Sequence, residues 1–451
     1  MLLIQADARA LPVPDGYVQC VVTSPPYWGL RDYGTVAQVW GGVEGCEHVW
    51  GEPLRAHHPG QVPDSKWPKN PDLQKGQTQA TGSCCQTCGA WKGHLGNEPT
   101  PEQYVANLVE VFREVRRVLR EDGTVWLNLG DSYARAGGTD RKPSTTAQAG
   151  NTKRSIEIAG DRTETLPPGL KPKDLVGIPW RVAFALQADG WYLRSDIIWA
   201  KPNPMPESVT DRPTRSHEYV FLLTKRATYY YDAEAVKEAS TGQGGAAANF
   251  ARATKRALVP GQAVTDHRLD RKPTFDTGGR NRRSVWMITP KPYRGAHFAT
   301  FPPQLVEPCV KAGSPEGGSC AACGTPLKRV IEKGPERREQ QIACGGDAEG
   351  DYDGVAQKDY ETAGAQDPSA VKARILAGMV ERRTVGWTRT CGCDPAGEVA
   401  QAVVLDPFCG SGTVGMVCAR EGRFFIGCDL KAEYLAMARD RILGRERACA
   451  G

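Results

Sequence analysis

The sequence predicts an α/β protein built on a doubly wound, mostly parallel sheet, and three observations support this prediction. Apolar strand-like runs follow stretches of helical period, as at 100–129. A run ending in Asp406 precedes a Gly-x-Gly turn and an apolar helical stretch, the opening unit of nucleotide-binding α/β folds. Of the 451 residues, 40% are hydrophobic and 24% charged, enough to build a buried core.

The N-terminal part of the chain supplies the first elements. Leu2–Ile4 and Val18–Val22 are short apolar runs typical of strands. Thr100 can cap a helix, with apolar residues recurring every three or four positions up to Leu119. The apolar run Thr124–Leu129 follows, so that a helix leads into a buried strand.

The same two periods predict the later elements. Helices are expected at 178–188, 302–311, 414–421 and 434–442, and strands at 192–200, 218–224, 402–406 and 423–429. Other stretches lack either period, in keeping with the high content of 50 Gly and 33 Pro. We expect core segments at 1–34, 98–232, 291–312 and 400–451, insertions at 35–97 and 313–399, a flexible insertion at 134–173, and a basic recognition region at 233–290.

Charge and hydropathy restrict the class of protein. No segment reaches the ~18 apolar residues of a membrane span, and the first residues lack the leader of a signal peptide. We therefore expect a cytoplasmic enzyme with no membrane partner. The net charge of +5 is small, yet 252–294 holds eleven Lys or Arg and three Asp or Glu. This basic region is either a nucleic-acid footprint or a solvated loop.

Fifteen cysteines are many for such a protein, and several lie in close pairs. Without an export signal, metal binding is the better interpretation of such pairs than disulfides. Two four-ligand zinc sites are predicted, one from Cys46, His48, Cys85 and Cys88 and one from Cys320, Cys323, Cys391 and Cys393. Cys84 could replace Cys85, and Cys344 is a spare ligand. The alternative is free thiols in loops.

The C-terminal Gly-x-Gly turn indicates a nucleoside rather than a phosphate ligand. Gly410-x-Gly412 lacks both the lysine of a phosphate-binding loop and the third glycine of a dinucleotide motif. Asp429 ends the next strand, 23 residues after Asp406, where a carboxylate can accept bonds from ribose hydroxyls. S-adenosylmethionine is the commonest such ligand. The alternative is a structural turn and a helix cap.

Two motifs resemble the DNA amino-methyltransferases, which modify cytosine N4 or adenine N6. They are Thr23-Ser24-Pro25-Pro26-Tyr27 and, far downstream, Asp406 to Thr413 (DPFCGSGT). Residues 104–131, Trp199 to Met205 (WAKPNPM) and His297 to Pro302 resemble further motifs of the family. The likeness covers about half of the chain and omits the insertions. Its motif order is that of the circularly permuted β-class.

The resemblance implies a seven-stranded S-adenosylmethionine-dependent methyltransferase fold and assigns the cofactor residues. Phe408, Gly410 and Gly412 would shape the pocket beside Asp406, and Asp429 would bind the ribose. Asp7 would approach the adenine. The methionine side would be lined by His297, Phe298, Thr300, Phe301 and Pro302, and Pro407, Ser411 and Thr413 complete the cofactor motif.

The catalytic motif suits methylation of an aromatic amine, whose lone pair is delocalised into the ring. Ser24 Oγ and the Pro25 carbonyl could accept the two N–H bonds and so localise that lone pair. Pro25 and Pro26 fix the backbone there, and Tyr27 could stack on an extruded base. Ser at the first motif position favours cytosine N4, because a neutral hydroxyl puts no charge beside the basic ring nitrogen; adenine N6 is the alternative.

Two other functions remain to be weighed. A carbon-5 cytosine enzyme would use a nucleophilic thiolate, but Cys309 is expected to be a buried hydrophobic residue, as are Cys20, Cys409, Cys418 and Cys428. A catalytically silent, zinc-containing DNA-binding protein is the more distant alternative. The expected partners are double-stranded DNA and a cognate restriction endonuclease.

Overall fold

The computed structural model describes residues 1–29, 35–55, 80–134, 167, 169–238, 280–290, 300–333, 382–394 and 397–445. The chain forms two compact units. The first comprises Met1–Tyr231, Ser284–Gly318 and Gln401–Gly451, and the second comprises Asp232–Arg283 and Ser319–Ala400. Within the described ranges, no helix combines the length and apolarity needed to cross a membrane.

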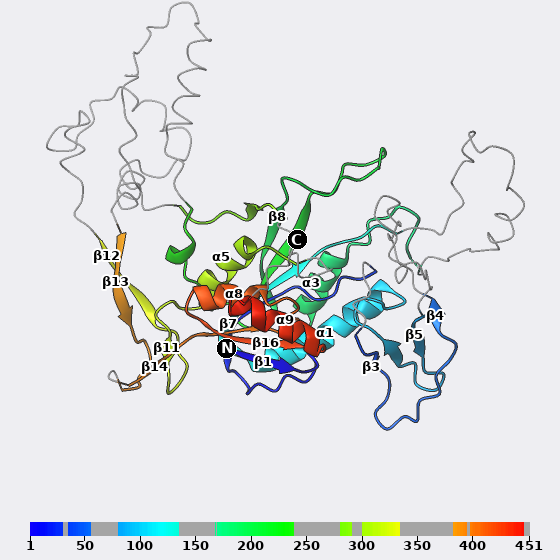
Figure 1. Cartoon of the computed structure of the whole chain (residues 1–451), viewed down its shortest axis with the longest axis horizontal. Helices are drawn as coiled ribbons and strands as arrows, with labels where there is room; N and C mark the ends of the chain where they lie inside the picture. The colour runs from blue at the N-terminus through cyan, green and yellow to red at the C-terminus, as the bar shows by residue number, and fades with distance from the viewer. Residues whose placement is uncertain are drawn as a thin grey trace, which may run out of the picture. The chain divides into compact units, whose positions relative to one another are not determined.

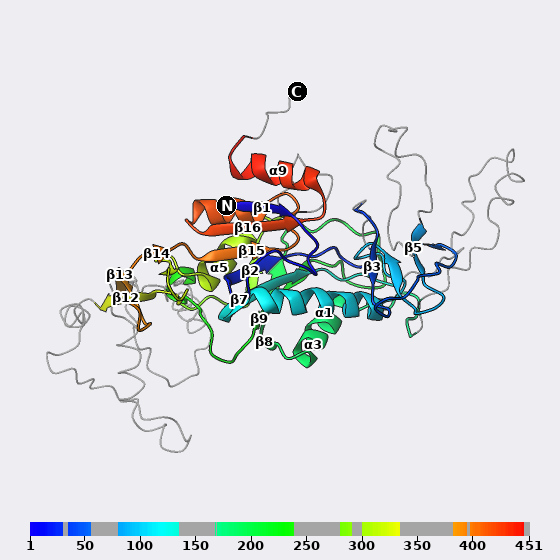
Figure 2. The ribbon, with the colours of Figure 1, turned by 90° about the horizontal axis from the view of Figure 1, so that it is seen from below.

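A mostly parallel sheet forms the centre of the first unit. Its strands are β1 (Leu2–Gln5), β16 (Phe424–Asp429), β15 (Val403–Asp406), β2 (Val18–Thr23), β7 (Leu119–Leu129), β9 (His217–Thr224), β8 (Tyr192–Ala200) and β10 (Val285–Met287), in that spatial order. Figure 2 shows all of these except β10 labelled in this order from top to bottom. Only β9 runs against its neighbours.

The sheet has eight strands, so the expected number of seven is wrong. The additional strand is β10, which extends the edge by pairing in parallel with β8. Its three residues are too few to show a period of two in the sequence. Trp286 is nevertheless buried and lies against Trp126, with ring centroids 6.4 Å apart, so packing holds this short segment in place.

Helices cover both faces of this sheet, as doubly wound folds require. On one face, α1 (Pro101–Val118) packs with α3 (Ile178–Ala188) over a core that includes Val125 and Leu127. Trp126 points the other way, toward α5 (Pro303–Gly313). Contacts of α5 with α8 (Thr413–Arg420), and of α8 with α9 (Ala432–Ile442), make a row of helices that Figure 1 shows side by side.

The predicted helices and strands of this core are confirmed to within a few residues. All six residues of β2 are buried, as are all four of β15. Parallel strands covered on both faces read as continuous apolar runs, which is why they stand out in the sequence. Thr100 caps α1 as expected, since its hydroxyl accepts from the Gln103 amide at 3.2 Å.

The insertion 35–97 forms a small antiparallel sheet, which we call the insertion sheet. It comprises β3 (Gln38–Trp40), β6 (Trp91–Gly93), β5 (Ala80–Cys84) and β4 (Leu54–Arg55), in that order. Trp40 and Trp91 pair across it, and both belong to the main core cluster beside α1. These two tryptophans thereby fix the insertion to the core of the first unit.

The described part of the second unit contains two antiparallel pairs of short strands. β12 (Lys328–Lys333) pairs with β13 (Arg382–Thr388), and β11 (Ser319–Cys320) pairs with β14 (Val399–Ala400). Arg329 Nε donates to Asp232 Oδ1 at 3.3 Å and to Oδ2 at 3.0 Å, and Arg329 Nη2 donates to Oδ2 at 2.7 Å. This bond ties β12 to the start of the basic region, most of which lies outside the described residues.

Candidate active site

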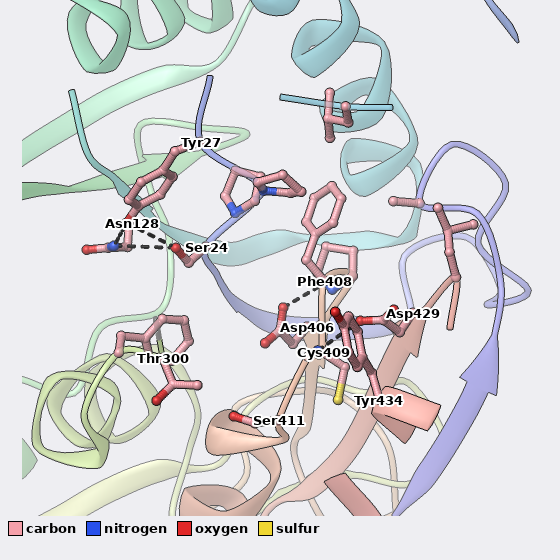
Figure 3. Close-up of a pocket in the computed structure, with 18 of the residues that line it drawn as sticks. Ser24, Tyr27, Asn128, Thr300, Asp406, Phe408, Cys409, Ser411, Asp429 and Tyr434 are labelled. Carbon is pink, nitrogen blue, oxygen red and sulfur yellow. Dashed lines mark hydrogen bonds between the residues drawn. The ribbon is translucent and has the colours of Figure 1, made fainter. Parts of the chain in front are cut away.

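The carboxyl ends of β2 and β15 bring the two sequence motifs together. The strands pair in parallel, with Leu405 beside Val21, so the residues that follow the two strands leave the sheet at the same end, that of the strand carboxyl termini. Thr23 Oγ1 donates to Asp406 Oδ1 at 2.7 Å, across 383 positions of sequence. A cavity of about 330 Å³ opens at this end and is lined from both motifs (Figure 3).

Most of the predicted site residues line this cavity. They are Asp7, Ser24, Pro25, Pro26, Tyr27, Thr300, Phe301, Asp406, Pro407, Phe408, Gly410, Ser411, Thr413 and Asp429. Pro302 and Gly412 do not line it: Pro302 lies at the amino end of α5, and Gly412 packs against Ala438 of α9. His297 and Phe298 are outside the described residues.

Two carboxylates stand at the cofactor end of the cavity. Asp429 Oδ2 accepts from the Gly410 amide at 2.9 Å, and its Oδ1 accepts from Lys431 N at 3.0 Å. Asp406 Oδ1 accepts from Phe408 N at 3.1 Å. Each carboxylate oxygen has two lone pairs, so these bonds orient the groups and leave them able to accept further bonds from a ligand.

Burial changes the acidity of both groups. Desolvation raises the pKa of Asp406 to about 7, although the bonds from Thr23 and the Phe408 amide lower it. Burial also raises the pKa of Asp429 above its ordinary value, against the bonds from neighbouring backbone amides. The cavity thus holds carboxyl groups whose charged forms gain from a cation placed beside them.

The Gly-x-Gly turn is fixed by packing as well as by the cavity. Gly412 has φ +74°, and a Cβ there would lie 2.7 Å from the Ala438 Cβ of α9. Buried Arg441 donates to Ser411 Oγ at 2.7 Å and to Thr413 Oγ1 at 2.8 Å. These two hydroxyls therefore serve the turn itself, and Gly412 permits the close approach of α8 and α9.

The catalytic motif joins a hydrogen-bond network on the opposite side of the cavity. Ser24 Oγ donates to Tyr27 Oη at 3.2 Å, and Tyr27 Oη donates to Glu218 Oε2 at 2.7 Å. Asn128 Nδ2 donates to Tyr27 Oη, to Ser24 Oγ at 3.4 Å and to Glu218 Oε2 at 2.9 Å (Figure 3 draws the bonds to Ser24 and Tyr27). Lys201 pairs with Glu218 Oε1.

The Glu218 carboxylate also fixes the orientation of the Asn128 amide. A carboxylate only accepts, so the amide nitrogen must face it and Oδ1 must point away. Asn128 Oδ1 is buried and has no hydrogen-bond partner among the described residues. Asn128 Oδ1 therefore points away from Ser24 and is enclosed by the protein, while the amide nitrogen faces the motif (Figure 3).

The backbone of the motif is held from behind. Tyr104 Oη donates to the Pro26 carbonyl at 2.7 Å, while the Pro25 carbonyl has no partner among the described residues. The Tyr27 ring lies against Gly130, where an added Cβ would be 2.6 Å from Tyr27 Cε2. Ser24, Tyr27 and the Pro25 carbonyl consequently occupy defined positions.

The insertion sheet supplies a third wall. Gln38, Trp40, His94 and Leu95 line the cavity together with Asp7. The Asp7 carboxylate accepts from Gln38 Nε2 at 2.5 Å and from Arg9 Nη2 at 2.7 Å. Asp7 is thus held by two side chains, one of which comes from the insertion.

Sequence reasoning missed several cavity residues. Asn128, Lys201 and Glu218 lie at the carboxyl ends of β7 and β8 and the amino end of β9, which meet at one sheet edge because β9 is antiparallel. Polar residues at the ends of otherwise apolar strands were the available signal. Gln38 gave no signal, because its position depends on how the insertion folds.

Both predicted cysteine clusters assemble. In each set, Cys46, His48, Cys85 and Cys88 or Cys320, Cys323, Cys391 and Cys393, the candidate ligand atoms all lie within 4.8 Å of one another. Cys85 rather than Cys84 faces the first cluster, and Cys344 lies outside the described residues. Three thiolates with one imidazole, or four thiolates, are donor sets that zinc prefers.

The remaining cysteines of the core are buried. Cys309 lies within α5, where its thiol donates to the Leu305 carbonyl at 3.3 Å, and it does not line the cavity. Burial raises the pKa of Cys20 to about 12. The Cys20 thiol therefore stays protonated near neutral pH, and Cys309 lies away from the cavity in which a nucleophile would act.

One cavity at the carboxyl ends of a mostly parallel sheet thus joins a carboxylate-bearing pocket to a Ser-Pro-Pro-Tyr turn, the arrangement expected of an S-adenosylmethionine-dependent amino-methyltransferase. The model of the DNA methylase family matches residues 18–321 and 396–440. The chain belongs to this family, the DNA amino-methyltransferases of the N4 and N6 type.

The chain is also similar to individual family members. The Type II methyltransferase M.XycI of Xanthomonas campestris pv. cyanopsidis is 34% identical over 98% of this chain and 88% of its own length. M.Cfr9I of Citrobacter freundii is 33% identical over the same shares. The solved structure of PvuII DNA methyltransferase (cytosine-N4-specific) aligns over 97% of this chain and 85% of that chain, with 13% identity and a TM-score of 0.42.

S-adenosylmethionine fits the residues of the cofactor end. The ligand carries a sulfonium, an ammonium, a ribose diol and a flat adenine. The cavity offers the buried carboxylate of Asp406 and the part-buried carboxylate of Asp429 for the polar groups, and Phe408, Leu430 and Tyr434 for the flat ring. When bound, the ligand supplies an electrophilic methyl group; the protein contributes binding and alignment.

Proposed function

We propose that this chain is a site-specific DNA methyltransferase that methylates cytosine N4 in double-stranded DNA. The observation that carries the proposal is the cavity that receives Ser24 and Tyr27 from one motif, Asp406 from the other, and Asp429 from the end of β16. The Type II relatives support site specificity and, as a partner in the cell, a cognate restriction endonuclease. The order of the two motifs along the chain supports the circularly permuted class.

In this proposal the catalytic end binds the target amine by its N–H bonds. The Ser24 hydroxyl donates a hydrogen bond to Tyr27 Oη, so a lone pair on Ser24 Oγ remains to accept a hydrogen bond from the amine. The Pro25 carbonyl accepts the second N–H bond. Both bonds favour a tetrahedral nitrogen whose lone pair points at the methyl group, and fixed geometry lowers the barrier further.

The target base has to leave the duplex to reach this cavity. Its amine is otherwise paired, and enzymes acting on such atoms extrude the base into a pocket. We propose that Tyr27 stacks on the extruded base. Asp429 would bind the ribose of the cofactor, and Phe408 would contact its adenine.

The choice of cytosine rests on the neutral Ser24. The nearby carboxylate of Glu218 already accepts from Lys201, Tyr27 and Asn128. The target amine would therefore meet a hydroxyl and a carbonyl oxygen rather than a free carboxylate. Adenine N6 is the alternative.

The test is to express the chain in a host without DNA methylation, digest the DNA to nucleosides and separate them by mass spectrometry. We expect N4-methylcytosine. N6-methyladenine alone would overturn the choice of base, and no modified base in any DNA would favour the catalytically silent DNA-binding protein.

We also propose that each cysteine cluster binds one zinc ion. Both donor sets are complete with four protein ligands, which is typical of structural rather than catalytic zinc. A staple of this kind suits insertions with little apolar surface of their own. The basic region at 233–290 is proposed to contact the DNA target.

A further inference from the structure

The first cysteine cluster connects the loop after β3 to the turn between β5 and β6. Cys46 and His48 lie in the loop, while Cys85 and Cys88 lie in the turn. The turn is closed by Cys85 N donating to the Ala90 carbonyl at 2.7 Å and Gly89 N donating to the Cys85 carbonyl at 3.0 Å. A metal ion bound to all four ligands would lock the ends of neighbouring strands together.

The insertion sheet needs such a lock because its strands are short. β3 and β6 have three residues each, and β4 has two. Isolated pairs of this length are not stable in water. The loop and turn approach closely: a Cβ on Gly42 would lie 3.0 Å from Cys88 Sγ and 2.6 Å from Ala90 Cβ. The geometry of the loop that follows β3 is therefore set at the cluster.

The same strand reaches the cavity at its other end. Trp40 of β3 pairs with Trp91 of β6. The Trp40 ring lies under the Arg9 guanidinium, with Arg9 Cζ 4.2 Å from the ring centroid. Arg9 Nη1 donates to the Val39 carbonyl at 2.6 Å. Gln38, the first residue of β3, binds Asp7.

Asp7 in turn stands beside the cofactor end. It follows β1, where Gln5 pairs with Asp429 and Ala6 N donates to the Asp429 carbonyl at 3.1 Å. Asp7 and Asp429 line one cavity. A continuous series of contacts thus runs from the first cysteine cluster through β3 to the proposed ribose-binding strand.

We infer that the zinc ion of the first cluster holds the β3 wall of the cofactor cavity, so that its loss weakens cofactor binding, whereas zinc in the second cluster does not serve this cavity. The inference rests on the proposed zinc and cofactor assignments. The second cluster lies in the second unit, and none of its residues lines the cavity.

The experiment compares full-length variants by zinc content and by calorimetric binding of S-adenosylhomocysteine. Cys88→Ser removes a ligand of the first cluster, Cys393→Ser removes one of the second, and Cys84→Ser is the matched control next to the first cluster. We expect Cys88→Ser to lose one zinc ion and to bind the nucleoside about tenfold more weakly or worse. Cys393→Ser should lose one zinc ion with unchanged nucleoside affinity, and Cys84→Ser should change neither.

Gln38→Met keeps the inference testable if Cys88→Ser does not fold. It removes the donor to Asp7 at similar volume, and we expect full zinc content with roughly tenfold weaker nucleoside binding. A second measurement uses Cys393→Ser, in which a chelator should abolish nucleoside affinity and added zinc should restore it.

Three results would overturn the inference: absence of zinc from the first cluster, unchanged nucleoside affinity after its loss, or an equal loss of affinity in Cys393→Ser. Failure of the proposed function looks different, because the wild-type protein would then not bind S-adenosylhomocysteine while both clusters held zinc.

Discussion

Asp406 is a buried carboxyl whose charge state depends on pH near neutrality. Burial raises its pKa from 3.8 to about 7. Between pH 3.8 and pH 7 the folded chain holds a proton on Asp406 that the unfolded chain has released. The contribution of Asp406 to the free energy of unfolding therefore falls as the pH rises to 7. Asp406→Asn keeps an oxygen that can accept from Thr23 and removes the ionisation.

We expect Asp406→Asn to be more stable than wild type at pH 8, by on the order of 1–4 kcal/mol. The gap should be smaller at pH 5, where the wild-type carboxyl is protonated in the folded state. Urea denaturation at both pH values measures the free energy of unfolding. A gap that does not depend on pH would contradict the prediction.

Mutations at the two ends of the cavity should have separate effects on DNA affinity and on nucleoside affinity. Tyr27→Ala removes the proposed stacking surface and should weaken binding of DNA that contains the target site by ~1–3 kcal/mol, while S-adenosylhomocysteine binding stays nearly unchanged. Asp429→Ala should do the reverse. Titrations of each ligand against each variant give the four affinities. Loss of nucleoside affinity in Tyr27→Ala with retained DNA turnover would mean that the ends are misassigned.

Among individual residues, those that carry a sequence motif could be predicted, and those placed by tertiary contacts could not. Ser24, Tyr27 and Asp429 follow apolar strands and reach the cavity as expected. Arg441 and Gln38 come from segments whose own sequence says nothing of the site. Their positions depend on which elements pack together, and a single sequence does not show this.

At the scale of the element, the spacing of apolar residues along the sequence predicted the long helices and buried strands, because each has enough residues to show its pattern. It missed β3, β6 and β10, which have three residues each. These strands owe their pairing to buried tryptophans and, by our proposal, to zinc. Neither cause leaves a periodic trace in the sequence.

Helix α5 offers a test of how closely these elements pack. A Cβ on Gly313, its last residue, would lie 2.5 Å from Thr124 Oγ1 and 2.7 Å from Cys20 Sγ, both on central strands. We expect Gly313→Ala to destabilise the fold by about 1–3 kcal/mol through overpacking. Gly386→Ala, where nothing lies within 4 Å, is the matched control. Denaturation curves of the two variants would agree if packing at α5 were loose.

At the scale of the whole molecule, each unit carries its own cysteine cluster. We expect purified protein to hold close to two zinc ions per chain and Cys320→Ser to lose one, because each cluster supplies four ligands for one ion. Elemental analysis measures the content, and calorimetry should show that the transition of the second unit is lowered. Protein made without chelators and found free of zinc would refute both assignments.

The pairing of β2 with β15 has a consequence for synthesis of the chain. β2 is synthesised long before its neighbour β15, and β1 long before its partner β16, because most of the other elements lie between them in the sequence. Until β15 has been made, one edge of β2 has no partner, and long-range pairing of this kind is slow. A nascent or prematurely terminated chain would expose that edge to aggregation. We therefore expect a chain interrupted before β15 to be degraded rather than to occupy DNA without methylating it.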